Sequence, residues 1–227
     1  EFRRGSSDLN ANQGAVYAFL RSGSTWSQQA KMVAADGAAN DQFGFSVALS
    51  GQTAAIGANL NDVGANADQG SVYVYITNGT TWSFQSQLTA ADGAAQDQLG
   101  ARVSLSGESL LAGAWLDDVA ANVDQGSAYV YTRSGVTWSQ QARLLAADGA
   151  AADSFGWALA LSGDTAVVGA QFDVVDGIIS AGSASVLTRA GAVWTQTAPL
   201  RAEGGEPNDR FGAAVADPQL RAQVALP

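Results

Sequence analysis

The chain repeats itself about every 56 residues, and a fixed period in this range indicates a repeat architecture in which each copy packs on its neighbours. This period limits the fold more than any other feature. A tryptophan recurs at Trp26, Trp82, Trp138 and Trp194. A Phe-Gly or Leu-Gly pair recurs with the same spacing from positions 43, 99, 155 and 211, each time two residues after an aspartate. Each copy is therefore expected to be one supersecondary unit.

Each copy has the pattern of four short strands. Large side chains alternate with small ones over 43–49, which is the period of a β-strand. Ser50-Gly51 then predicts a turn into a second strand over 53–58. A longer loop leads to a third strand over 72–76, and a fourth begins at the repeated tryptophan. Val, Thr, Tyr and Phe fill these segments and Gly interrupts them, so a helix is disfavoured.

Four-stranded repeats of this kind predict an all-β fold, and specifically a β-propeller of four-stranded antiparallel blades. A β-solenoid usually has shorter rungs, and one copy of the repeat is small for a separate sandwich. The sequence repeats are 13–68, 69–124, 125–180 and 181–227, which together form one propeller domain over 13–227. Residues 1–12 match no repeat, and Glu1-Phe2 is typical of a cloning remnant.

The phase of the repeats predicts how a ring would close. The chain starts with the third and fourth strands of a repeat, over 14–32, and ends with the first and second, over 211–226. We therefore expect four blades, the last one shared between the two terminal segments. Residues 217–223 copy the repeat poorly, so pairing of half-blades between two chains in a homodimer is the alternative to a closed monomer.

Charge and composition exclude several functions. A net charge of -10 disfavours binding to nucleic acid and to anionic membranes. The chain has no Cys and no His, which removes disulfides, thiolate metal sites and the commonest general base. No apolar run approaches the roughly 20 residues that a membrane-spanning helix needs, so membrane insertion is not expected.

Asp-x-Phe-Gly, followed by Ser-Val-Ala-Leu-Ser-Gly and Gly-Ala, resembles the FG-GAP repeats of integrin α-subunits and many bacterial extracellular proteins. The resemblance covers 13–216, and Gly-Ser-x-Tyr-Val-Tyr with Thr-Trp-Ser is similar to the bacterial branch. It implies a propeller in an accessory or adhesive module, secreted or on the cell surface. The chain departs from the integrin-type repeats in one connection. Integrin-type repeats carry a calcium loop between the Phe-Gly strand and the Gly-Ala strand, whereas here only Ser50-Gly51-Gln52 connects them. Calcium binding of the integrin type is therefore not expected at this connection.

The loop after each Gly-Ala pair is the best candidate for a metal site. It clusters carboxylate and amide oxygens near Gly, and these are the ligands that calcium prefers. The spacing does not match an EF-hand, and Asn, Asp and Gly also form ordinary turns. The candidate ligands are Asn59, Asn61, Asp62, Asp68, Asp117, Asp118, Asp124, Asp173 and Asp176.

Two other residue sets are candidates for chemistry or recognition. Asp36 and Asp41, with their equivalents, could form a carboxylate pair, but they recur in successive copies as turn-stabilising residues would. The repeated tryptophans could stack on sugars or fill the space between blades. Trp115 and Trp157 break the repeat; Trp157 is expected in the core, which leaves Trp115 as the candidate for ligand contact, with Asp117 and Asp118 beside it.

The sequence thus predicts a non-enzymatic binding, adhesion or protein-interaction scaffold outside the cell, with a protein or glycan partner. The first alternative is a lectin-like propeller with repeated glycan sites. The second is a calcium-binding structural fragment of a larger protein.

Overall fold

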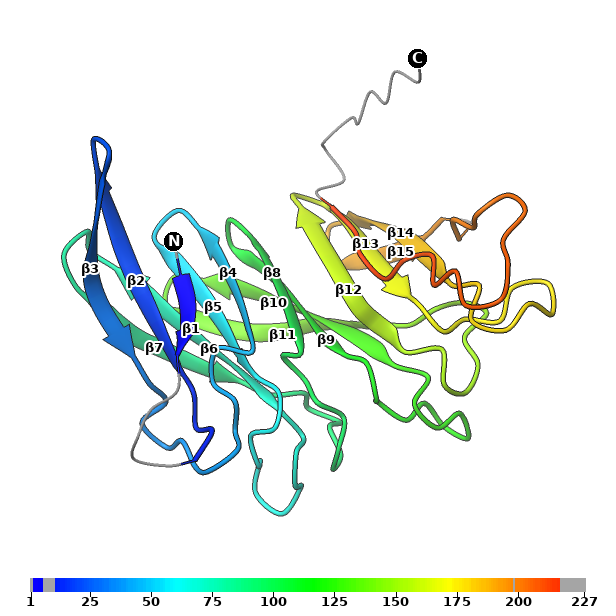
Figure 1. The fold of residues 1–227 in the computed structure, drawn as a ribbon, viewed down its shortest axis with the longest axis horizontal. Coiled ribbons are helices and arrows are strands. Elements are labelled where there is room, and N and C mark those ends of the chain that lie inside the picture. The colour runs from blue at the N-terminus through cyan, green and yellow to red at the C-terminus, as the bar shows by residue number, and fades with distance from the viewer. Residues whose placement is uncertain (1, 6–10, 198, 217–227) are drawn as a thin grey trace.

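A computed structural model describes residues 2–5, 11–197 and 199–216 of the chain. The described residues form fifteen β-strands and no helix, and so none that could cross a membrane. The strands form four antiparallel sheets, which follow one another in sequence order across the molecule (Figure 1). Sheet one contains β1 (Phe2–Gly5), β2 (Ala15–Ser22) and β3 (Thr25–Met32). Sheet two contains β4 (Ser46–Ser50), β5 (Thr53–Ala58), β6 (Ser71–Thr77) and β7 (Trp82–Leu88).

Sheets three and four repeat the topology of sheet two. In each, neighbours in sequence are neighbours in the sheet, as expected for strands joined by short connections. Sheet three contains β8 (Arg102–Ser106), β9 (Ser109–Ala114), β10 (Ser127–Ser134) and β11 (Thr137–Leu144). Sheet four contains β12 (Phe155–Ser162), β13 (Thr165–Ala170), β14 (Ser183–Ala190) and β15 (Val193–Gln196). The predicted repeat unit of four antiparallel strands is therefore confirmed.

The hydrophobic core lies in the three junctions between consecutive sheets. All six residues of β5 are buried, because this strand has a sheet on each side. Successive side chains of a strand point to opposite faces. Ala54 and Ile56 consequently join the cluster shared with sheet one, whereas Ala55 joins the cluster shared with sheet three. A third cluster fills the junction between sheets three and four.

The repeated glycines let consecutive sheets approach each other closely. A Cβ atom on Gly57 would lie 1.9 Å from the carbonyl oxygen of Gly100, and one on Gly113 would lie 2.3 Å from that of Gly156. Backbone hydrogen bonds reinforce the same junctions, since the Leu99 amide donates to the Gln69 carbonyl at 2.8 Å. The Gly-Ala and Phe-Gly markers of the sequence are thus two halves of one contact between sheets.

The first sheet differs from the predicted composite blade. β1 pairs with the edge of β2 that the C-terminal segment was expected to occupy. Its register matches that of β5 on β6: Arg3 lies opposite Tyr17 as Ile56 lies opposite Tyr73. Although 1–12 match no repeat in sequence, Phe2–Gly5 take the place of a second strand. Residues 211–216 form no strand, and 217–226 lie outside the described residues.

Residues 2–5, 11–197 and 199–216 form an open row of sheets, not a closed ring. Sheets one and four stand at opposite ends of the row (Figure 1), and no strand of one pairs with a strand of the other among the described residues. The predicted blade architecture is therefore present as an open row of sheets.

Candidate functional site

The repeated tryptophans connect consecutive sheets. The indole N–H of Trp82 donates to Gln29 Oε1 at 3.0 Å, and that of Trp194 donates to Gln141 Oε1 at 3.1 Å. Trp138 makes the same bond and is only 7% exposed. This geometry favours the space-filling interpretation of these residues over sugar stacking. In the described part of the chain no sheet precedes that of Trp26, which is 49% exposed.

The repeated aspartates stabilise turns. Asp41 and Asp97 each accept a hydrogen bond from the backbone amide three residues earlier, at 2.7 and 2.6 Å. Asp153 and Asp209 do the same. Burial raises the pKa of Asp97 to about 6 and that of Asp153 to about 6. A recurring turn contact of this kind favours the interpretation of these residues as turn-stabilising.

Asp117 is buried and holds side chains of sheet three. Its Oδ2 accepts hydrogen bonds from the Tyr129 hydroxyl at 2.9 Å and from Arg143 Nη2 at 2.6 Å, as well as from the Ser127 hydroxyl. A buried carboxylate with three donors has its charge compensated within the protein. Its neighbour Asp118 is exposed, and its carboxylate accepts the Asp124 backbone amide at 2.8 Å.

The other predicted calcium ligands are spread over three loops. In the first loop, Asp62 accepts the Asp68 amide at 2.9 Å, just as Asp118 accepts the Asp124 amide in the second. Asn61 donates to Asp41 at 3.2 Å, and Asn59 donates to Gln98 at 3.2 Å.

In the third loop, Asp173 is buried and Asp176 is exposed. Across the three loops and the rest of the described chain, no three acidic side chains gather where they could hold a metal ion. The geometry therefore assigns most of these residues to the shape of their own loops and junctions.

Three aromatic residues gather in the junction between sheets three and four, and two of them are the tryptophans that stand outside the 56-residue series. Trp157, at the start of β12, lies between Trp115 and Phe172. Its ring centroid is 4.9 Å from that of Trp115 and 6.1 Å from that of Phe172, both in edge-to-face arrangements. The Arg102 guanidinium lies 5.4 Å from the Trp157 ring centroid. Trp157 is thus half-buried in an aromatic cluster, not in the closed core that was expected.

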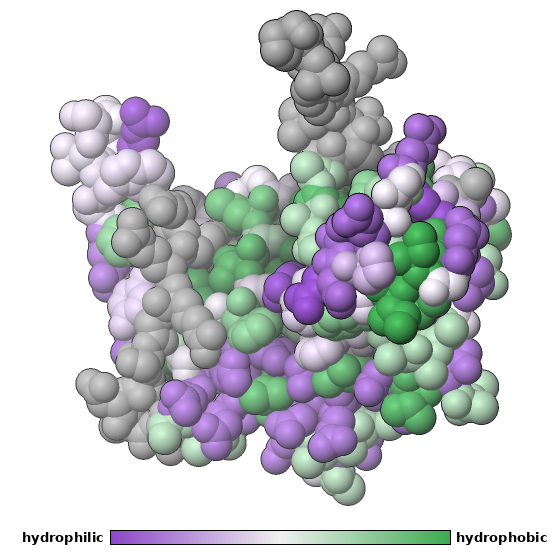
Figure 2. Space-filling view, turned by 45° about the vertical axis from the view of Figure 1, so that its right-hand side comes forward, coloured by the Kyte–Doolittle hydropathy of each residue, from purple (hydrophilic) through white to green (hydrophobic). Residues whose placement is uncertain are grey.

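An apolar groove of about 420 Å³ adjoins this cluster. Trp115 and Phe172 form one part of its lining, and Val174 and Ile179 form another. Ile179 is 66% exposed. Figure 2 shows apolar side chains gathered among hydrophilic ones on the side of the molecule where the C-terminal sheet lies. Half-buried aromatic side chains beside exposed branched apolar ones around a concave surface are typical of a binding site.

The sequence identified one member of this groove and missed the rest. Trp115 stands where the first copy has Asn59, and that difference is visible in the repeat. Phe172 replaces a leucine, Leu60 or Leu116, and so carries no comparable signal. Trp157 replaces Phe45, which is another large residue. Only the packing of the two sheets brings the three rings together.

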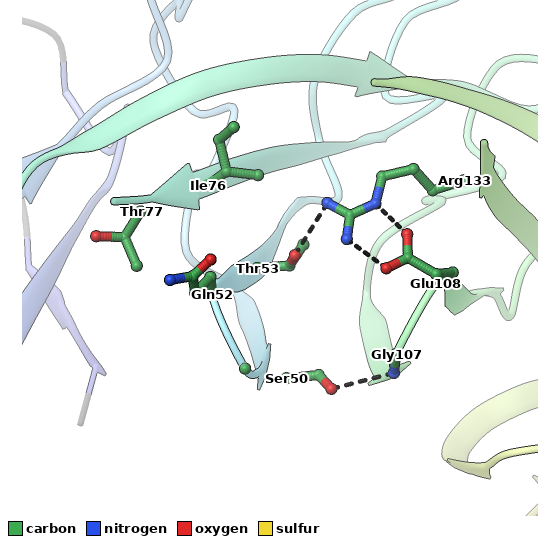
Figure 3. A pocket seen from close by; sticks show the side chains of 9 residues that line it. Ser50, Gln52, Thr53, Ile76, Thr77, Gly107, Glu108 and Arg133 are labelled. Atoms are coloured by element: carbon green, nitrogen blue, oxygen red, sulfur yellow. Dashed lines mark hydrogen bonds and ion pairs between the residues drawn. The ribbon is translucent and has the colours of Figure 1, made fainter. Parts of the chain in front are cut away.

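A second open pocket, of about 370 Å³, lies between sheets two and three at their hairpin turns (Figure 3). Arg133 crosses it: its Nη2 donates to Glu108 Oε1 at 2.7 Å, and its Nη1 donates to Thr53 Oγ1 at 3.1 Å. The hydrogen bond from Arg133 lowers the pKa of Glu108. This arginine is already neutralised and joins the two sheets, so the pocket offers an anionic ligand no free charge.

Comparison with known proteins identifies the repeat. The family model described as FG-GAP repeat matches the chain three times, over residues 26–75, 82–131 and 138–187. No curated protein matches the chain.

Proposed function

This chain belongs to the FG-GAP repeat family, and we propose that it is a non-enzymatic binding module that contacts a partner protein through the groove beside Trp115 and Phe172. One observation carries the proposal: Trp115 and Trp157, the two tryptophans outside the 56-residue series, meet in one junction with Phe172, beside exposed apolar side chains. Residues that serve only blade packing recur in successive copies, whereas a specific partner needs one differentiated surface. Aromatic side chains are also enriched at the centres of protein interfaces.

The setting we propose is outside the cell or at its surface. The support for it is the resemblance of the repeats to those of bacterial extracellular proteins. A glycan partner, as in a lectin-like propeller, is the alternative, because exposed aromatic rings can also stack on sugars.

A photo-crosslinking amino acid at position 179 tests the protein-partner proposal. Introduced in the organism that makes the protein, it should give one crosslinked species of discrete mass. The matched control is position 136, since Val136 is 75% exposed but lies in the β10–β11 turn, away from the groove. Trp115→Ala should abolish the crosslink at 179. Equal crosslinking at 136 and 179, or a glycan-array signal lost in Trp115→Ala, would contradict the proposal.

We also propose that sheets one and four close into a four-bladed propeller in the working protein. Among the described residues, sheet one lacks only an innermost strand beside β1. Phe211-Gly212 contacts Gly182 and Gly169 as earlier Phe-Gly pairs contact their junctions, and such pairs precede the innermost strand of the next sheet. The residues after Gly212 can therefore supply the missing strand.

An engineered disulfide tests closure, and the absence of native cysteine makes the test clean. By the register of Val47 on Ile56, residue 215 would lie opposite residue 3. The double variant Arg3→Cys/Val215→Cys should form an intramolecular disulfide in a monomer of 23.1 kDa. A disulfide-linked dimer would instead support half-blade pairing between chains. Two free thiols under oxidising conditions would rule out closure in this register.

A further inference from the structure

A pocket of about 240 Å³ lies between sheets one and two, on the outer side of their junction. It combines aromatic rings with a carboxylate, and it shares no lining residue with the groove beside Trp115. Its lining residues are Ala35, Asp36, Tyr73, Tyr75, Phe84 and Gln87.

The same position in the next junction is filled from within the protein. Arg143 Nη1 bonds to Asp92 Oδ2 at 2.9 Å, and its guanidinium lies 5.8 Å from the Tyr129 ring centroid. Gln140 Oε1 accepts the Ala91 backbone amide at 3.0 Å. In the third copy, Asp148 also bonds to an arginine, Arg201, at 2.7 Å. An arginine is therefore the group that this aspartate pairs with in two of three junctions.

Two substitutions open the pocket at the first junction. Phe84 replaces the glutamine that would accept the Ala35 amide, and Gln87 replaces the arginine that would pair with Asp36. Gln87 is neutral, and its Nε2 donates to the Tyr73 hydroxyl at 3.0 Å. Among the described residues, Asp36 receives one side-chain hydrogen bond, from the Tyr73 hydroxyl at 2.9 Å, and no cation.

The buried ion pair of Asp117 and Arg143 has two neutral residues, Asn61 and Gln87, at the equivalent positions of this junction. Asn61 stands where Asp117 holds Arg143, and its Oδ1 accepts from Gln87 at 3.1 Å. The charge of Asp36 has no such compensation in the described part of the chain. It remains at the surface of a chain whose net charge is -10.

The aromatic side chains around Asp36 suit a planar cation. The rings of Tyr75 and Phe84 lie 5.7 Å apart with an angle of 70° between their planes. Tyr73 and Phe84 lie 6.2 Å apart. Phe84 is 55% exposed, so its ring is open to a ligand. A guanidinium group stacks on aromatic rings and bonds to carboxylates in a way that a compact ammonium ion does not.

We propose that this pocket binds the guanidinium group of an arginine side chain presented by a partner protein. The arginine takes the place beside Asp36 that Arg143 takes beside Asp92. Its carboxylate contact is charge-assisted, and its planar face lies on Phe84. This site is at a different junction from the Trp115 groove and does not depend on it.

A titration followed by amide NMR tests the site. The probe is N-acetyl-arginine methylamide, and the matched probe is N-acetyl-citrulline methylamide, which has almost the same shape without the charge. We expect saturable shifts at residues 35, 36 and 84 with a dissociation constant of about 1 mM, and binding of the citrulline probe at least about tenfold weaker. Equal binding of the two probes would overturn the proposal, as would the same shifts produced by methyl glycosides alone.

Three variants test the site without relying on the ratio between the two probes. Asp36→Asn keeps an acceptor for Tyr73 and should weaken arginine binding at least about tenfold. Gln87→Arg should abolish binding, because it rebuilds within the chain the pair seen at Asp92 and Arg143. The control Asp148→Asn removes a carboxylate that is already paired and should leave the dissociation constant unchanged. Arginine binding that persists in Gln87→Arg would show that the pocket is not the site.

Discussion

The indole N–H of Trp138 donates a 2.8 Å hydrogen bond to Gln85 Oε1, and this bond joins sheet three to sheet two. Arg133 covers the same indole, with its guanidinium carbon 5.4 Å from the ring centroid. Removing the acceptor would leave a buried donor without a partner, a change that usually costs about 1–3 kcal/mol. We therefore expect Gln85→Leu to lower the free energy of unfolding by about 2 kcal/mol in urea titrations.

Trp26 provides the matched comparison for this contact. Trp138→Ala should cost about 3–5 kcal/mol, as removal of a buried aromatic ring does. In the open row no preceding sheet covers Trp26, which is 49% exposed, so Trp26→Ala would cost less than half as much. The closed ring proposed for the working protein places sheet four on this side of sheet one and should make the two losses similar. Losses that differ by more than about twofold would contradict closure and would mean that sheet one stays uncovered in solution.

A methyl group at Gly57 should damage the junction between sheets two and three. Its Cβ atom would lie 1.9 Å from the Gly100 carbonyl oxygen, a backbone atom that cannot rotate away. We expect Gly57→Ala to reduce the free energy of unfolding by about 3 kcal/mol or more, at the upper end of overpacking. Gly205→Ala is the control, because its nearest neighbour would be 3.7 Å away. Similar unfolding midpoints for the two variants would contradict this account.

Asp97 and Asp153 should give the protein a pH-dependent stability. Burial raises the pKa of each to about 6, whereas an unfolded aspartate titrates near 3.9. Their contribution to stability is thus complete below about pH 4 and is lost as the pH rises through about 6. In the double variant Asp97→Asn/Asp153→Asn the side-chain oxygens can still accept the backbone amides of Ala94 and Ala150. Asparagine does not titrate, so the loss of stability with rising pH should disappear.

Urea unfolding at pH 4 and pH 7 measures this effect. From pH 4 to pH 7 the free energy of unfolding of the parent should fall by on the order of 2 kcal/mol per site. The double variant should not show this fall. An identical pH profile in parent and double variant would show that these carboxylates are not buried in the folded protein.

Asp117 and Asp118 are neighbours in sequence with different structural roles. Asp117→Ala should cost about 3–5 kcal/mol, because it leaves the buried side of Arg143 without a carboxylate. Asp118→Ala removes only a loop contact to the Asp124 amide and should cost about 0.5–1 kcal/mol. Thermal melts at one pH compare the two directly. The reverse order would mean that Asp118, not Asp117, is the carboxylate that holds Arg143.

Calcium should leave the stability of the protein unchanged. The carboxylates of Asp62 and Asp118 accept backbone amides within their own loops, and no three acidic side chains of the described chain gather where they could hold a metal ion. At about 5 mM calcium, above the dissociation constants of most extracellular calcium modules, we expect no shift in the melting midpoint. A rise that is lost in Asp118→Ala would instead establish the second loop as a calcium site.

The sequence predicted the local structure well because the signals for it are local. Alternation of large and small side chains marked the strands, and Ser-Gly and Asp-Gly marked the turns. The loop aspartates show where this reasoning stops. A cluster of Asn and Asp either binds a cation or caps its own backbone, and the direction of each side chain decides between the two. Asp117 and Asp118 are adjacent, yet one is buried and the other is exposed.

What the sequence determined by itself is the unit: four antiparallel strands, repeated at a fixed spacing, in an FG-GAP chain. The tertiary structure alone decided which side chains of different copies meet. Trp82 and Gln29 are 53 residues apart, and the pocket beside Asp36 arises from two substitutions at Phe84 and Gln87 in the following copy. Such contacts depend on two sheets at once, so the pattern within one strand contains no record of them. The place of β1 was also decided by the tertiary structure, because the unpaired backbone groups of an open strand edge can pair with a segment that shows no sequence repeat.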